Sequence, residues 1–208
     1  FLEKLFKFRQ DISVIGIAGP GDPMCDADKT LATFEKCKSH FPNALLCLST
    51  NGLALPEHVD EIVRLGVSHV TVTVNAVTPD VGSKVYSWVR YEGKNYYGEE
   101  AARILLARQD EGIRKLKEAG MLVKINTVVI PGVNIDHVQS ISAKAKQWGA
   151  DIMNCMAMIP VHDTPFENLK SPSTDEIHRI RRSIGGDIDQ MTHCSRCRAD
   201  ACGKLGER

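Results

Sequence analysis

Five short runs of apolar, largely β-branched residues recur along the chain, and helical periodicity follows each of them. The runs predict strands at Val14–Ala18, Leu45–Ser49, His69–Val74, Val123–Val129 and Ile152–Ala157. Strands that alternate with helices form a parallel sheet with right-handed crossovers. The sequence therefore predicts an α/β fold, either an open doubly wound sheet or a barrel. In both folds, ligands bind at the carboxyl ends of the strands.

The segments between these strands have the end signals of helices. Helices are predicted from Asp28 to about His40, from Pro56 to Gly66, from Thr78-Pro79, from Glu99 to Ala119, from Ile135 to Trp148, and from a capping box at Ser173-Thr174-Asp175-Glu176. Two segments interrupt this alternation: a polar, aromatic insertion at Arg90–Gly98 and a Cys-rich tail at Asp187–Arg208. We therefore expect a main domain over residues 1–186 and a separate C-terminal tail over residues 187–208.

The composition excludes several classes of function. The formal net charge is zero and no stripe of Lys and Arg is present, so nucleic acid is not an expected partner. The apolar stretches are too short to span a membrane, and the first residues do not form a signal peptide. We expect a cytoplasmic protein, and the missing initiator Met suggests that the chain begins inside a longer one. Seven Cys, an odd number, favour metal binding or buried thiols over disulfides.

The first predicted strand ends in Gly19-Pro20-Gly21-Asp22-Pro23. A turn of this kind exposes backbone groups to a small ligand because few side chains block the approach. Asp22 is placed to accept a hydrogen bond from an ammonium group. An ordinary connection between strand and helix explains the same residues equally well. The segment is not a dinucleotide-binding fingerprint, because it lacks the spacing GxGxxG.

The later strand ends also carry unusual residues. Cys47 and Ser49 are expected on one face of their strand, because side chains alternate, and Asn51 follows at the strand's end. Asn75 follows the third strand, and the apolar loop Ile130–Asn134 follows the fourth. Each has an ordinary alternative, since cysteine is commonly a small buried hydrophobe and asparagine is common in turns.

The tail contains His193-Cys194-Ser195-Arg196-Cys197, with Cys202 five residues on. Two cysteines at this spacing can ligate one metal ion or cluster. A redox dithiol is the alternative, but that motif normally opens a helix in a thioredoxin-like unit, which this sequence does not predict. One such pair is too few ligands for a closed site, so further ligands must come from elsewhere.

Several of these segments resemble the NifB family of nitrogenase cofactor maturases, which are radical S-adenosylmethionine (SAM) enzymes. The segments, in the same order as in the family, are Gly16–Pro23, Leu46–Pro56, Val70–Asn75, Glu100–Leu105, Ile130–Asn134 and His193–Ala201. The resemblance covers nearly the whole chain. It implies a partial (βα)6 TIM-like barrel in which this chain supplies strands two to six.

The resemblance also implies a function. Enzymes of this family cleave SAM reductively on a [4Fe–4S] cluster to give a 5′-deoxyadenosyl radical. They fuse two further [4Fe–4S] clusters around a carbide derived from the SAM methyl group, which yields the eight-iron precursor of the nitrogenase cofactor. The implied cofactors are SAM, the SAM cluster and two auxiliary clusters. The implied partners are a reductant, cluster donors and nitrogenase cofactor-assembly proteins.

The family's roles carry over to matching positions. Gly19, Gly21 and Asp22 match the loop that holds the SAM amino group, and Ser49, Asn51 and Asn75 match contacts to its carboxylate or ribose. Ile130 and Val133 match the adenine-side wall. Cys47 matches a ligand to one auxiliary cluster, and Cys194 and Cys197 match ligands to the other. Cys25, Cys37 and Cys155 have no match and are expected to be buried or incidental thiols, and Cys202 is undecided.

One departure from the family is serious. The Cys-x-x-x-Cys-x-x-Cys motif that ligates the SAM cluster is absent, and it belongs on a first strand that would precede Phe1. We expect this strand to be missing from the chain. Two alternatives stay open: another radical SAM enzyme with auxiliary clusters, such as a peptide modifier, or a degenerate barrel that serves as a cluster carrier or scaffold.

Overall fold

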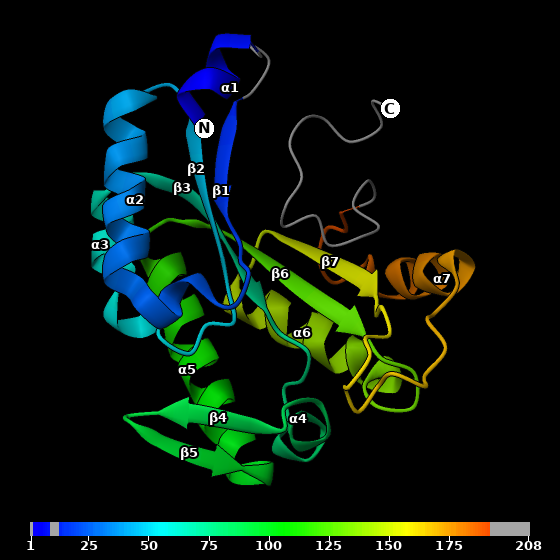
Figure 1. Cartoon of the computed structure of the whole chain (residues 1–208). Coiled ribbons are helices and arrows are strands. Elements are labelled where there is room, and N and C mark those ends of the chain that lie inside the picture. Colours follow the sequence, from blue (N-terminus) through cyan, green and yellow to red (C-terminus); the bar gives the residue numbers. More distant parts are fainter. Residues whose placement is uncertain (1, 9–12, 192–208) are drawn as a thin grey trace.

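The five predicted strands form one parallel sheet in the computed structural model, which describes residues 2–8 and 13–191 (Figure 1). The strands are β1 (Val14–Ile17), β2 (Leu45–Thr50), β3 (Val67–Thr73), β6 (Leu122–Val129) and β7 (Ile152–Ala157). Their order is β1-β2-β3-β6-β7, and every neighbouring pair is parallel. In the described part of the chain β1 and β7 are the two edges of an open sheet, as expected for a partial barrel.

Helices α2, α3, α5 and α6 lie together on one side of this sheet (Figure 1). The helices are α1 (Leu2–Phe8), α2 (Ala27–His40), α3 (Val59–Arg64), α4 (Pro79–Val85), α5 (Gly98–Glu118), α6 (Val138–Trp148) and α7 (Thr174–Ile184). Short 3-10 turns are η1 (Pro23–Asp26), η2 (Leu55–Glu57) and η3 (Ile135–His137). The predicted capping box of α7 is confirmed, with Ser173 and Glu176 bonded to each other's backbone N–H groups.

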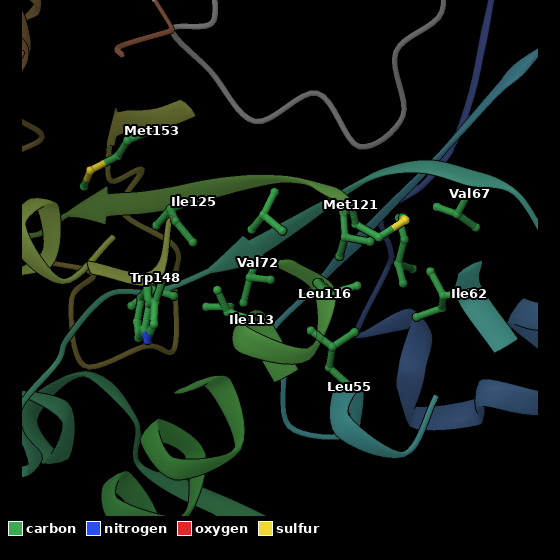
Figure 2. Packing of buried hydrophobic residues seen from close by; sticks show 14 of the residues in the cluster. Leu55, Ile62, Val67, Val72, Ile113, Leu116, Met121, Ile125, Trp148 and Met153 are labelled. Atoms are coloured by element: carbon green, nitrogen blue, oxygen red, sulfur yellow. The ribbon is translucent and has the colours of Figure 1, made fainter. Parts of the chain in front are cut away.

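The hydrophobic core fills the space between the sheet and these helices. Figure 2 shows Val72 of β3 and Ile125 of β6 beside Ile113 and Leu116 of α5, and all four are almost completely buried. On β2, Leu46 and Leu48 are fully buried, whereas Cys47 and Ser49 between and after them are half-buried. This alternation assigns the two faces of each strand, because successive side chains point to opposite sides.

The segment Arg90–Gly98, predicted only as a polar insertion, belongs to a β-hairpin. Strands β4 (Trp88–Tyr91) and β5 (Lys94–Tyr97) pair antiparallel. Both residues of the two-residue turn have positive φ, 49° at Glu92 and 77° at Gly93. Turns with positive φ at both central residues match the twist of paired strands, and glycine favours them. The signal that sequence reasoning missed was the pair Glu92-Gly93 between two short segments that both contain aromatic residues.

Two predicted helices are shorter than expected, and one was not predicted. The helix expected from Pro56 is divided into η2 and α3, because His58 between them has a φ of −116°. The helix expected from Ile135 likewise begins as η3 before α6. Helix α1 precedes the first strand, and Phe6 in it stacks on Phe41 at a ring separation of 4.3 Å.

Asp110 connects α5 to α6. Its ionisation is expected to make the stability of the fold depend on pH. Burial raises the pKa of Asp110, but hydrogen bonds from Arg114, Trp148 and Lys144 outweigh it and hold this pKa well below its ordinary value. A carboxylate with a lowered pKa in the folded state adds stability above its unfolded pKa of about 4, and this stability is lost as the pH falls.

We therefore expect Asp110→Asn to lower the free energy of unfolding at pH 7 by about 1 kcal/mol, as is typical of partly exposed ion pairs. The difference from wild type should shrink toward pH 3. Urea unfolding at both pH values measures it, and an equal difference at the two values would contradict this role of the carboxylate.

Candidate functional site

The loop after β1 is fastened to the end of β2 by Asp22. Its carboxylate accepts from the Met24 backbone N–H at 2.9 Å, from the Thr50 hydroxyl at 2.9 and 3.1 Å, and from the Asn51 backbone N–H. Gly19 and Gly21 before it have φ of 144° and 76°, which only glycine adopts readily. Both Asp22 oxygens thus accept hydrogen bonds from the protein itself, which orient the carboxylate in this loop.

Removing this carboxylate is expected to destabilise the fold. Asp22→Ala leaves the Met24 and Asn51 N–H groups and the Thr50 hydroxyl without their acceptor, and hydrogen bonds to charged groups contribute about 1.5–3 kcal/mol each at most. We expect the free energy of unfolding to fall by about 3 kcal/mol in urea titrations at pH 7. Asp22→Asn keeps one acceptor oxygen, so its loss should be smaller, and equal losses would show that the carboxylate oxygens are not the cause.

A buried glutamine that sequence reasoning missed joins the ends of β2 and β3. Gln109 of α5 is fully buried, and its amide donates to the Asn51 carbonyl at 2.7 Å and to the Thr73 carbonyl at 3.0 Å. Asn51 also accepts from the Leu53 N–H through its side-chain oxygen at 2.8 Å. The available signal was a polar residue on the apolar stripe of α5, four residues after Leu105.

Asn75 lies two residues after the end of β3, at the predicted end of the sheet. Its side-chain oxygen accepts from the Val128 N–H at 2.9 Å, and its own N–H donates to the Tyr86 hydroxyl at 3.2 Å. Burial raises the pKa of Tyr86 to about 12, so this phenol is neutral at physiological pH. Asn75 therefore ties β3 to β6 through its oxygen.

Asn134 closes the apolar loop after β6. It is fully buried, donates to the carbonyls of Asn75 at 3.0 Å and Val128 at 2.9 Å, and accepts from the Ile130 N–H at 2.7 Å. Ile130 is 3% exposed, and Val133 is half-buried. Sequence reasoning noted Asn134 only as the end of the motif. Its three bonds fix the loop at the carboxyl ends of β3 and β6.

The second part of the site is the sheet face turned away from α2, α3, α5 and α6, here called the inner face. In parallel strands, residues in register project to the same side. The strand register places Cys47 beside His69, Ser49 beside Thr71, Thr71 beside Lys124, and Asn126 beside Asn154. The inner face is defined by these polar residues: Cys47, Ser49, His69, Thr71, Lys124, Asn126 and Asn154. The predicted shared orientation of Cys47 and Ser49 is confirmed.

The electrostatics of the inner face centre on Cys47, which is a free thiol. Burial raises the pKa of this thiol, and the charge of Lys124 and a hydrogen bond with Thr71 act in the opposite direction. Burial also lowers the pKa of His69, and Lys124 adds to that shift. At neutral pH both groups are therefore uncharged. A metal that binds the Cys47 sulfur must displace its proton.

The inner face carries a side chain that can ligate an iron–sulfur cluster, the thiol of Cys47. Cysteine sulfur is the usual protein ligand of such clusters. Two buried side-chain atoms on this face, Asn126 Oδ1 and Asn154 Nδ2, have no hydrogen-bond partner within the described residues. Buried polar atoms without partners are rare in folded proteins, and a ligand is one of their explanations.

The remaining cysteines differ in burial, and some lie outside the described residues. Cys37 and Cys155 are buried, as expected for quiet thiols, and burial raises the pKa of Cys155 to about 12. Cys25 is exposed. The predicted ligands Cys194 and Cys197 lie outside the described residues, as do His193 and Cys202. The sequence holds no Cys-x-x-x-Cys-x-x-Cys motif, so no residues of this chain fit the SAM cluster.

Comparison with known proteins decides the family. Residues 2–145 match the radical SAM superfamily. The chain belongs to this superfamily. Superfamily membership implies SAM and a [4Fe–4S] cluster as cofactors. It also agrees with the parallel sheet and with the placement of the unusual residues at its carboxyl ends.

The expected resemblance to the NifB family is confirmed. The chain is 41% identical over 207 residues to the FeMo cofactor biosynthesis protein NifB of Chlorobaculum tepidum, covering 100% of this chain and 49% of that protein. It is 44% identical to NifB of Klebsiella pneumoniae, over 94% of this chain and 43% of that protein. The value for NifB of Sinorhizobium fredii is 46%, over 94% and 40%. The chain thus spans half or less of the length of these relatives.

A solved structure supports the architecture. The crystal structure of Streptococcus suis SuiB superposes with a TM-score of 0.57 over 85% of this chain and 38% of that one, at 14% sequence identity. At that identity the likeness concerns the fold alone. None of the described helices is long and apolar enough to cross a membrane.

Proposed function

We propose that this radical SAM protein acts as a NifB-type enzyme. It takes two [4Fe–4S] clusters as substrates and fuses them, with a carbide derived from the SAM methyl group, into the eight-iron precursor of the nitrogenase cofactor. The observation that carries the proposal is the match of nearly the whole chain to proteins named for FeMo cofactor biosynthesis. The free Cys47 thiol on the inner face supports it independently.

SAM is proposed to bind across the carboxyl ends of β1, β2, β3 and β6. The Asp22 carboxylate, oriented by its hydrogen bonds within the protein, and the backbone of Gly19–Gly21 are proposed to receive the amino group. Ser49, Asn51 and Asn75 are proposed to contact the carboxylate or ribose. The side-chain oxygen of Asn51 is bonded to Leu53, which leaves its amide N–H groups as donors. Ile130 and Val133 are proposed to line the adenine.

The substrate clusters are proposed to bind at two places. Cys47 holds one on the inner face, and Cys194 with Cys197 holds the other from a tail over residues 187–208, while residues 1–186 form the barrel. Further partners are an external reductant, cluster donors and nitrogenase cofactor-assembly proteins.

Anaerobic turnover of the full encoded protein tests this function. The reconstituted protein is incubated with SAM and dithionite, and its products are analysed. We expect S-adenosylhomocysteine from methyl transfer, 5′-deoxyadenosine from reductive cleavage, and a cluster product that activates cofactor-deficient nitrogenase. Cleavage of SAM without activation favours a different auxiliary-cluster enzyme. Bound iron with no cleavage favours a carrier or scaffold, the alternative that the missing cysteine motif suggests.

The cysteines of the tail are expected to contribute separately to the iron content. Changing both Cys194 and Cys197 to Ala is expected to remove about four iron atoms per chain, one [4Fe–4S] cluster, after reconstitution. Iron and sulfide analysis with Mössbauer spectroscopy measures the loss. Cys25→Ala, which alters an exposed cysteine without an assigned role, is the matched control and should retain all iron. An iron content in the double variant equal to that of the control would remove the tail cysteines from cluster binding.

A further inference from the structure

Lys124 stands out among the charged residues of the sheet. It is a half-buried residue of the inner face of β6, in register with Thr71 of β3. Thr71 is in turn in register with Ser49 of β2, two residues after Cys47. Neighbouring strands lie about 4.8 Å apart, so β6 is about 10 Å from β2, and β3 runs between them (Figure 1). A group bound to the Cys47 sulfur over β3 would therefore lie close to the lysine side chain.

The surroundings of Lys124 differ from those of other partly buried lysines. Lys117 pairs with Asp151 at 2.7 Å, and Lys144 pairs with Asp110 at 2.9 Å. Lys124 forms no ion pair with any residue in 2–8 or 13–191. Its ammonium group is therefore available to an anion on the inner face. An iron–sulfur cluster bound to a thiolate is an anion of this kind, and its sulfides accept hydrogen bonds.

We infer that Lys124 is the counter-charge of the iron–sulfur cluster bound by Cys47, and that it holds this cluster over β3 and raises its reduction potential. This inference rests on the proposed function, because it requires a cluster on Cys47. Reduction adds one negative charge to the cluster, so a fixed positive charge nearby favours the reduced form. Lys124 is thus a positioning residue for the cluster that Cys47 ligates.

Redox titration of the full encoded protein, monitored by EPR, tests the inference. In Lys124→Gln one cluster signal should become harder to reduce by at least tenfold in its equilibrium constant, about 59 mV for one electron. Lys124→Arg keeps the charge and should stay close to wild type. Lys94→Gln makes the same charge change on the exposed hairpin and should shift no signal. The Lys124→Gln change removes an unpaired charge from a half-buried position, so the fold should be retained.

Comparison with Cys47→Ala assigns the signal. The signal that moves in Lys124→Gln should be the one that Cys47→Ala lacks, and adding Lys124→Gln to Cys47→Ala should move none of the others. If Cys47→Ala deletes a signal but Lys124→Gln shifts none, the inference is wrong and the cluster site stands. If Cys47→Ala leaves iron and all signals unchanged, the proposed site itself fails. Weaker SAM binding in Lys124→Gln with unchanged reduction potentials would indicate that Lys124 binds the SAM carboxylate. That result would overturn the inference.

Discussion

Cys47→Ala is expected to lower nitrogenase activation by at least about 100-fold in the full encoded protein, since removing an anchoring group from a reacting centre commonly has effects of this size. The Cys47 sulfur is the one inner-face thiol in the described part of the chain. Without it, one of the two proposed substrate clusters would have no ligand on the sheet. Iron bound after reconstitution should also fall by about four atoms per chain.

The measurements separate loss of cluster from loss of fold. Far-UV circular dichroism and SAM binding should stay near wild type, because alanine fits the half-buried position without added volume. SAM cleavage without productive methyl transfer should persist. Cys25→Ala, treated in parallel, should activate nitrogenase normally. Full activation of nitrogenase by the Cys47→Ala protein would show that Cys47 has no role in the reaction.

Asn134→Ala is expected to cause the largest loss of stability, about 3–5 kcal/mol in the free energy of unfolding. The substitution removes the donor to the Asn75 and Val128 carbonyls and the acceptor of the Ile130 N–H. All of these groups lie around a side chain with no exposed surface, so water cannot replace it. Buried groups that lose their partners retain the full cost of desolvation.

Urea unfolding at pH 7 measures this effect. Asn43→Ala is the matched control, because Asn43 is exposed in the turn before β2 and its loss should change stability by less than about 0.5 kcal/mol. Hydrogen exchange should accelerate at the Ile130 N–H in Asn134→Ala. Equal stability of the two variants would show that the loop after β6 does not depend on the Asn134 bonds.

The sequence by itself determined the five strands of the parallel sheet and the faces of those strands. The β-branched runs have the period of strands, and the five strands appear within two residues of their expected positions. Alternation along β2 placed Cys47 and Ser49 together on the inner face, because the two-residue period of a strand needs no tertiary information. The capping box of α7 was equally predictable, since Ser173 and Glu176 lie within one helical turn.

Only the tertiary structure decided which polar atoms meet. Asp22 accepts from Asn51, 29 residues away, and Gln109 donates to Asn51 from 58 residues away. Asn134 reaches Asn75 across 59 residues. Local periodicity cannot reveal such pairs, because they depend on strand order, register and the seating of α5 against the sheet. The place of Lys124 near Cys47 has the same origin: the two residues lie on strands separated by β3, and only the register of β2, β3 and β6 brings them to one face.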